Sequence, residues 1–140
     1  MLASGIPEGA TAADIEQTFQ ALASALPEAV AVIDLPAGGF QDDRKRAAQV
    51  VPILKAQGRG LITYERGLNA ADQVARREDL PAALIFRQLD AEGEAGPVLR
   101  RYLDRAAFKA AQEGRVAVVG STRPETVAAI LEWTVEGRAA

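Results

Sequence analysis

The chain has 140 residues, of which 49% are hydrophobic and 25% are charged, and its net charge is −3. This length and composition are those of a single globular domain with a real core. The net negative charge does not favour binding to nucleic acid or to an anionic membrane surface. No apolar run approaches the roughly 20 residues of a membrane span. We therefore expect neither a nucleic-acid partner nor membrane insertion.

Several kinds of chemistry are excluded because the sequence holds no cysteine and no histidine. Without cysteine there is no disulfide, no thiolate nucleophile and no Cys-type zinc site. Without histidine the commonest metal ligand and the commonest general base near neutral pH are missing. The N-terminus, MLASGIPEGA, lacks the basic region and the long apolar stretch of a signal peptide. The compartment of the protein is left open, and we expect neither a metal nor another cofactor.

The first half of the chain predicts alternating helices and strands after a flexible segment at residues 1–10. Thr11 and Asp14 have the spacing of a capping box, and apolar residues follow at helical spacing until Pro27. The next expected elements are a strand at 29–34, a helix at 42–57, a strand at 60–64, a helix at 69–78 and a strand at 82–86. Pro52 lies inside the second helix, where it predicts a kink or a late helix start.

The second half predicts a long helix at about 97–113, a strand at 116–120 and a last helix that ends near Gly137. Thr122 and Glu125 have the spacing of a second capping box, with Pro124 in the first turn, where its missing N–H costs nothing. The side chains expected to face inward from the long helix are Val98, Leu99, Leu103 and Phe108.

Short strands that alternate with helices favour a parallel sheet with right-handed crossovers. We find no internal repeat and no low-complexity tract. The sequence therefore predicts one α/β domain over 1–140, built from alternating βα units around a parallel sheet.

Polar side chains follow each of the four expected strands. Sites in parallel α/β folds form outside the carboxyl ends of the strands, so these residues are candidates to line a ligand-binding rim. The alternative is that strand ends are polar because they meet water. The candidate residues are Asp34, Glu65, Arg87, Asp90, Ser121 and Arg123.

The turn at Ser121 and Thr122 precedes a helix, whose N-terminal N–H groups can hold an anion or can simply be capped. Neither GxGxxG nor GxxxxGK[ST] occurs, so nucleotide binding has little support. Ser121 has no GxSxG elbow and no histidine base, which excludes a hydrolase triad.

Three stretches resemble the divergent polysaccharide deacetylase family. VAVVGSTRPETVAAILEW resembles its I-G-H-P-R-P-E-T segment, and LPEAVAVIDLPAGGF resembles L-P-x-A-V-G-V-N-N-H-M-G-S-x-F. LKAQGRGLITYERG resembles K-A-R-G-L-x-F-x-D-S-R. The three motifs occur in the family's order across roughly residues 5–137.

The resemblance implies a (β/α) barrel of the polysaccharide-deacetylase and glycoside-hydrolase type, of which this chain is the C-terminal part. It also implies an exported or periplasmic protein of the cell envelope. The family's catalytic positions are altered, because Leu35 and Ser121 stand where the family has histidines. Thr63, or a residue beside it, stands where the family has the aspartate of D-S-R. No catalytic residue and no metal ligand is therefore carried over.

Three functions follow from these observations. The first is a deacetylase-like domain without activity that binds a polysaccharide or an envelope protein as a scaffold. The second is a metal-dependent deacetylase that is active only in a full-length parent, where Asp34, Glu65 or Asp90 would complete an oxygen-rich site. The third is a protein-interaction module that forms a homo-oligomer through uncovered sheet edges.

Overall fold

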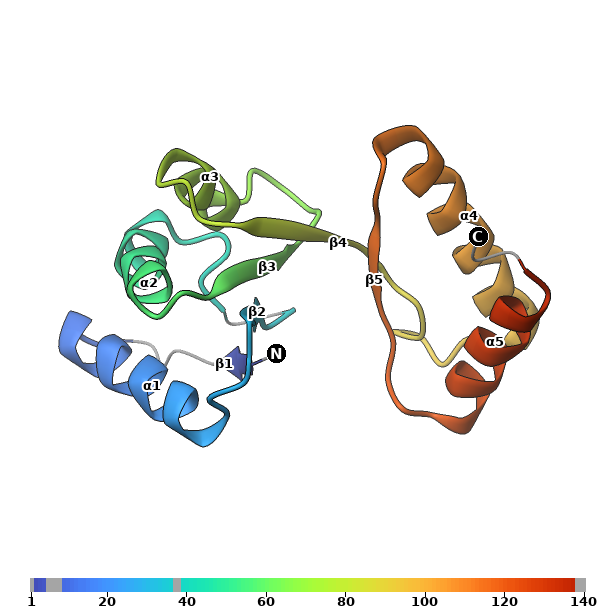
Figure 1. The fold of residues 1–140 in the computed structure, drawn as a ribbon, viewed down its shortest axis with the longest axis horizontal. Coiled ribbons are helices and arrows are strands. Elements are labelled where there is room, and N and C mark those ends of the chain that lie inside the picture. The colour runs from blue at the N-terminus through green and yellow to red at the C-terminus, as the bar shows by residue number, and fades with distance from the viewer. Residues whose placement is uncertain (1, 5–8, 37–38, 138–140) are drawn as a thin grey trace. The chain divides into compact units, whose positions relative to one another are not determined.

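The computed structural model describes residues 2–4, 9–36 and 39–137, and the chain divides into two compact units, Met1–Leu84 and Ile85–Ala140 (Figure 1). Each unit is described by itself. The elements of the first unit are β1 (Leu2–Ser4), α1 (Ala12–Ala25), β2 (Ala31–Asp34), α2 (Arg44–Ala56), β3 (Gly60–Tyr64), α3 (Ala70–Arg77) and the start of β4 (Ala82–Gln88). The second unit holds the rest of β4, then α4 (Gly96–Glu113), β5 (Ala117–Val119) and α5 (Pro124–Val135).

The strands of the first unit are parallel and lie in the order β1-β2-β3. Leu2 lies opposite Val32 on β2, and Ala31 lies opposite Gly60 on β3. The core includes Phe19 of α1 and Phe40, whose rings meet edge to face with centroids 6.2 Å apart. The other large, fully buried core side chains are Ile15, Val32, Val50, Val51, Leu54, Leu61 and Val74.

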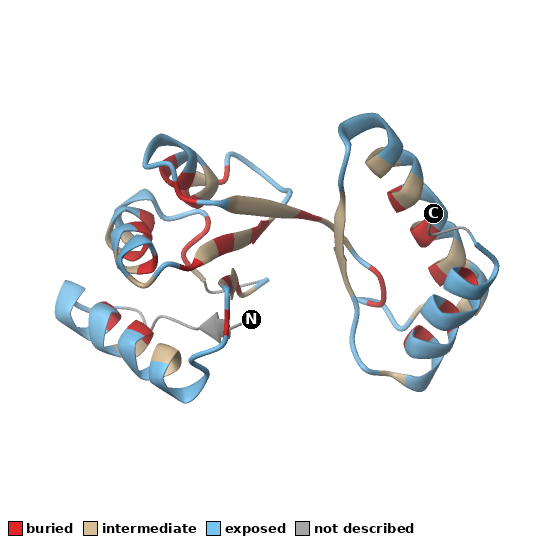
Figure 2. Cartoon of the chain, viewed as in Figure 1, coloured by how far each residue is buried: buried red, intermediate tan, exposed pale blue. Residues whose placement is uncertain are grey.

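The second unit pairs the end of β4 with β5, again in parallel, with Ile85 opposite Ala117. The register shifts between Ile85 and Arg87, as in a β-bulge. Helices α4 and α5 pack together and are joined by an ion pair between Arg100 and Glu132. The core residues of this unit are Leu89, Leu99, Leu103, Ala129 and Trp133. Figure 2 shows the buried residues gathered inside each unit.

The alternating, parallel α/β arrangement expected from the sequence is confirmed. The first capping box is also confirmed, since the Asp14 N–H donates to Thr11 Oγ1 at 3.2 Å and the Thr11 N–H donates to Asp14 Oδ2 at 3.1 Å. The segment expected to be flexible, 1–10, includes strand β1, and its residues 1 and 5–8 lie outside the described residues.

A late start of α2 at Pro52 is wrong. The helix begins at Arg44, because Asp43 caps it by accepting a hydrogen bond from the Arg46 N–H at 3.0 Å. Pro52 lies on the exposed face of the helix. Buried apolar residues on both sides of it, Val51 and Leu54 among them, hold the helix against the core across the missing N–H.

Two expectations for the second unit are also wrong. Phe108 is 67% exposed, because the buried stripe of α4 runs through Leu99, Leu103 and Ala106 and Phe108 falls beside it. No capping box forms at Thr122, because α5 starts at Pro124 and the capping position is therefore Arg123, which makes no side-chain cap bond.

Of the helices that the structure describes, none combines the length and the apolar character needed to cross a bilayer.

Candidate functional site

The loop after β2 is closed by the side chain at the end of that strand. Asp34 is 1% exposed, and its carboxylate accepts hydrogen bonds from the N–H groups of Leu35 at 2.9 Å, Phe40 at 3.0 Å and Gln41 at 2.7 Å. Burial raises the pKa of Asp34, and these N–H groups oppose that rise because they favour the ionised form. The carboxylate is thus engaged by its own loop.

The Asp34 loop closes only because residue 39 is glycine. A Cβ atom at Gly39 would lie 1.9 Å from Asp34 Oδ1, well inside van der Waals contact. The Asp34 side chain cannot swing aside without losing its backbone donors. Gly39 is therefore required by close approach, and not by an unusual φ angle.

The side-chain amide of Gln41 pairs with the backbone of Tyr64 at the end of β3, as the peptide group of a neighbouring strand would. Its Oε1 accepts from the Tyr64 N–H at 2.7 Å, and its Nε2 donates to the Tyr64 carbonyl at 2.7 Å. Asn69 strengthens the same strand end, since its Nδ2 donates to Thr63 Oγ1 at 2.8 Å. Burial and the nearby charge of Asp34 raise the pKa of Tyr64. Sequence reasoning missed Gln41, because its partner lies 23 residues away and no local pattern marks the pairing.

In the second unit Asp90 holds the turn between β5 and α5. It is 7% exposed, and its Oδ2 accepts from the Ser121 N–H at 2.9 Å, the Ser121 hydroxyl at 2.6 Å and the Thr126 hydroxyl at 2.6 Å. The Ser121 and Thr126 hydroxyls lower the pKa of Asp90, and Arg123 lowers it further. Gly120 lets this turn lie close to α5, because a Cβ there would meet Thr126 Cγ2 at 2.9 Å.

Two buried polar atoms beside this turn have no hydrogen-bond partner among the described residues. They are Asp90 Oδ1, an acceptor, and Arg123 Nη1, a donor. Arg123 reaches the Glu94 carbonyl at 3.5 Å and the Glu125 carboxylate at 3.8 Å only through Nη2. Buried polar atoms are normally paired, so the two unpaired atoms mark a place where a bound polar group would be held.

The six residues predicted from the sequence thus have different surroundings. Asp90, Ser121 and Arg123 come together in the second unit. Arg87 belongs to the same unit, but its guanidinium stacks over the Tyr102 ring at 4.1 Å from the centroid. In the first unit Asp34 is enclosed by its loop, and Glu65 is exposed one residue after β3.

The side chains do not fit the metal that the family resemblance implies. Within residues 2–4, 9–36 and 39–137, no three His, Cys, Asp or Glu side chains are grouped so that they could hold a metal ion. Asp34 accepts hydrogen bonds through both of its carboxylate oxygens. Asp90 accepts all of its bonds through Oδ2, which leaves one free oxygen with no second acidic ligand beside it.

The alternating βα units, the parallel strands and the structural match below identify the chain as part of an α/β barrel of the deacetylase type. A crystal structure of an uncharacterised protein, ATU2773 from Agrobacterium tumefaciens C58, has the same fold, with a TM-score of 0.70 and 21% sequence identity. The match covers 77% of this chain and 44% of the neighbour, so this chain spans less than half of the neighbour's length. No curated protein matches the sequence. The divergent polysaccharide deacetylase family matches residues 3–140, and the chain belongs to that family.

The Asp34 loop gives a first prediction, for Gly39→Ala. The added methyl group would overlap the Asp34 carboxylate, so we expect a loss of about 1–3 kcal/mol in the free energy of unfolding and a lower midpoint in thermal unfolding followed by circular dichroism. Gly96→Ala is the matched control, because a Cβ there meets nothing within 4 Å. Equal midpoints for Gly39→Ala and the unchanged protein would contradict the requirement for close approach.

The Asp90 turn gives a second prediction, for the pH dependence of stability. Because the Ser121 and Thr126 hydroxyls hold the folded pKa of Asp90 below the usual aspartate value of 3.8, its ionisation stabilises the folded chain above that value. This contribution is lost as the pH falls from 3.8 through the folded pKa. The stability difference between the unchanged protein and Asp90→Asn should therefore shrink between pH 6 and pH 2.5 in urea unfolding.

Asp34→Asn is the control for this second prediction. Burial raises the folded pKa of Asp34, so its ionisation opposes folding above its unfolded pKa. The stability difference between the unchanged protein and Asp34→Asn should grow as the pH falls. The same trend for both variants would contradict the two assignments.

Proposed function

We propose that this chain is a deacetylase-family domain without catalytic activity that serves as a carbohydrate-binding scaffold of the cell envelope. The observation that carries the proposal is the pair of unpaired, buried atoms, Asp90 Oδ1 and Arg123 Nη1. For sugar hydroxyls to use them, the turn must open enough to admit a hydroxyl that donates to Asp90 Oδ1 and one that accepts from Arg123 Nη1. Both bonds are charge-assisted, and such bonds are stronger than those between neutral groups.

The Asp90 turn supports this role because it keeps the Asp90 carboxylate ionised and fixed in position. Hydrogen bonds from Ser121 and Thr126 lower the pKa of Asp90, so the side chain is a carboxylate at neutral pH and accepts but does not donate. The same bonds fix the carboxylate, since three donors converge on Oδ2 while Oδ1 is buried without a partner. Little ordering of Asp90 is then needed when a sugar binds.

The proposal of inactivity is supported by what stands at the family's catalytic positions. A leucine, Leu35, can neither bind a metal nor transfer a proton, and Ser121 is already bonded to Asp90. Metal-dependent deacetylation needs an ion that activates water and polarises the acetyl carbonyl. The carboxylate beside Leu35, Asp34, is engaged by backbone donors.

The third prediction tests the scaffold by isothermal titration with oligomers of N-acetylglucosamine, an acetylated glycan. We expect binding at micromolar or tighter affinity. Arg123→Ala should weaken it at least about tenfold, since a hydrogen bond from a charged group contributes roughly 1.5–3 kcal/mol. Arg77→Ala is the control, because Arg77 lies at the end of α3 in an exposed pair with Glu78.

Two outcomes would contradict parts of this proposal. Absence of binding to any glycan would leave the Asp90 turn with a purely structural role. Release of acetate from the oligomers in the presence of added zinc, abolished by Asp34→Ala, would show an active deacetylase and overturn the claim of inactivity.

A second candidate function, a self-associating interaction module, is favoured by the outer face of α5. Val127, Leu131 and Val135 follow one another at intervals of four residues and are 42%, 60% and 86% exposed. Ile130 extends the same stripe at 37%. An apolar stripe of this kind on a surface helix is characteristic of a protein contact. A second copy of the chain can bury it by packing the same face against itself.

The fourth prediction is that the protein sediments as a dimer or larger species at high concentration. Leu131→Glu should shift it to the monomer, because a carboxylate would be buried in the contact. Ala13→Glu adds the same charge on the exposed face of α1 and should leave the association unchanged. A monomer at all concentrations would exclude the homo-oligomer.

A further inference from the structure

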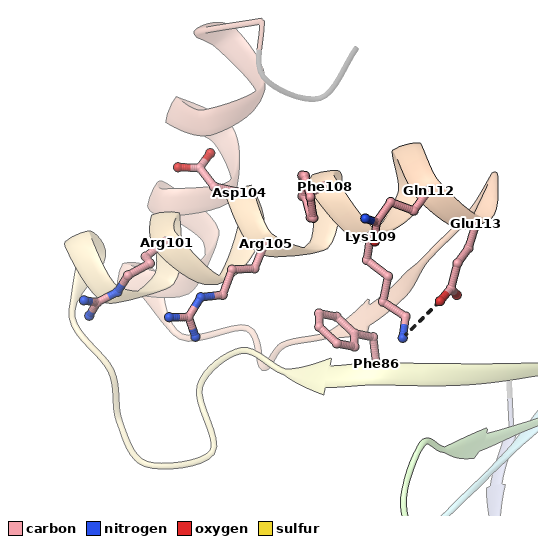
Figure 3. A pocket seen from close by; sticks show the side chains of 8 residues that line it. All are labelled: Phe86, Arg101, Asp104, Arg105, Phe108, Lys109, Gln112 and Glu113. Carbon is pink, nitrogen blue, oxygen red and sulfur yellow. Dashed lines mark ion pairs between the residues drawn. The ribbon is translucent and has the colours of Figure 1, made fainter.

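An open hollow of about 500 Å³ lies between β4 and α4, wholly within the second unit. Figure 3 shows its walls: Phe86 rises from β4 towards α4, while Arg105 and Lys109 reach down from α4 on either side of it. The volume is in the range of sites for small molecules. None of its lining residues belongs to the strand-end candidates, so this hollow is separate from the Asp90 turn.

Two guanidinium groups in the hollow are available to a ligand. Arg101 and Arg105 are exposed and one helical turn apart on α4, and within the described ranges no hydrogen bond or ion pair engages either of them. Their neighbour Lys109 is occupied instead, since its ammonium lies 4.6 Å from the centre of the Phe86 ring and 3.5 Å from a Glu113 oxygen.

The charges around the hollow favour an anion with a single charge. Three cations line it together with two carboxylates, those of Asp104 and Glu113, so one positive charge is left over. A carboxylate matches that balance, whereas a phosphate dianion would exceed it. The planar fork of an arginine binds a carboxylate through two parallel hydrogen bonds, which fixes the orientation of the bound group.

Two aromatic rings supply apolar surface to the hollow. Phe86 is half-buried, and Phe108 is 67% exposed at the edge of the hollow, an unusual position for a phenylalanine without a partner. A flat ring with an apolar face would cover both phenyl groups from water while its carboxylate meets the arginines.

We propose that this hollow binds a small ring compound that carries one carboxylate, with Arg101 and Arg105 on the carboxylate and Phe86 and Phe108 against the ring. An aromatic carboxylate and a uronate sugar share this chemistry. The site does not depend on the proposed glycan-binding function, because it uses different residues.

The protein contains its own reporter for binding. Its single tryptophan, Trp133, donates from Nε1 to Asp104 Oδ1 at 2.9 Å, and Asp104 lines the hollow. A carboxylate placed next to Asp104 changes the electrostatic field at that indole. Tryptophan emission should therefore change as the hollow fills.

The fifth prediction is a saturable change of Trp133 emission when benzoate or glucuronate is added to the whole chain at neutral pH and low ionic strength. The neutral counterparts, benzyl alcohol and glucose, should give no saturable change. Saturation by one acid only would identify the ring as aromatic or as a sugar. Arg101→Gln and Arg105→Gln should each weaken binding about two- to fivefold.

Matched variants separate this site from the rest of the molecule. Arg115→Gln removes an exposed charge just after α4, outside the hollow, and should leave the affinity unchanged. Arg123→Ala should also leave it unchanged, so failure of the glycan-binding proposal and failure of this one can be told apart. Circular dichroism of each glutamine variant should match that of the unchanged protein.

Three results would overturn the proposal. They are no saturable change with either acid, an equal response to the neutral compounds, and an affinity that Arg105→Gln does not alter. An emission change that follows the protein concentration alone, and that Leu131→Glu does not abolish, would show that a second copy fills the hollow and would overturn it as well.

Discussion

The carboxylate of Asp34 is the interaction on which the first unit depends. By accepting the N–H groups of Phe40 and Gln41, it fixes the return of the chain after β2. Phe40 is thereby placed in the core against Phe19, and Gln41 is placed where its amide pairs with Tyr64 at the end of β3. One buried side chain thus links a strand end, the hydrophobic core and the neighbouring strand. An acid at a strand end, which looks like a ligand-binding group in the sequence, serves the fold.

Asp90 repeats this arrangement in the second unit with one difference. Its donors, Ser121 and Thr126, converge on a single oxygen, so the other oxygen keeps its capacity to accept. Arg123 lies close enough to affect the ionisation of Asp90 and carries an unpaired donor of its own. Two aspartates at equivalent strand ends therefore differ in what they offer a ligand. Both carboxylate oxygens of Asp34 are bonded, whereas Asp90 keeps one buried oxygen without a partner.

The sequence predicts those features of the fold that depend on interactions between residues close together in the chain. The Thr11 capping box and the Asn69 helix start are set within a few residues, and the structure has them where the sequence places them. Phe108 was misplaced because the inward side of α4 is set by what α5 covers, which no window on α4 contains. The Thr122 capping box does not form because α5 starts at Pro124, in a turn whose Ser121 and Thr126 bond Asp90, 31 and 36 residues earlier. Distant pairings of this kind also explain why Gln41 was missed.

The loss of the family's histidines need not remove recognition of a ligand, since catalysis and binding make different demands. A metal-dependent hydrolysis fails when one ligand is replaced by leucine, because the remaining groups cannot activate water. Binding of a hydroxyl needs only a fixed acceptor and a fixed donor, and the proposed site assigns these to Asp90 and Arg123 without a metal. Ser121 illustrates the difference between catalysis and binding. It aligns with a family histidine, and its hydroxyl donates to the Asp90 carboxylate and orients it. Under the proposed function, the chemistry of the strand ends is lost while the turn at Ser121 keeps groups that a sugar would contact.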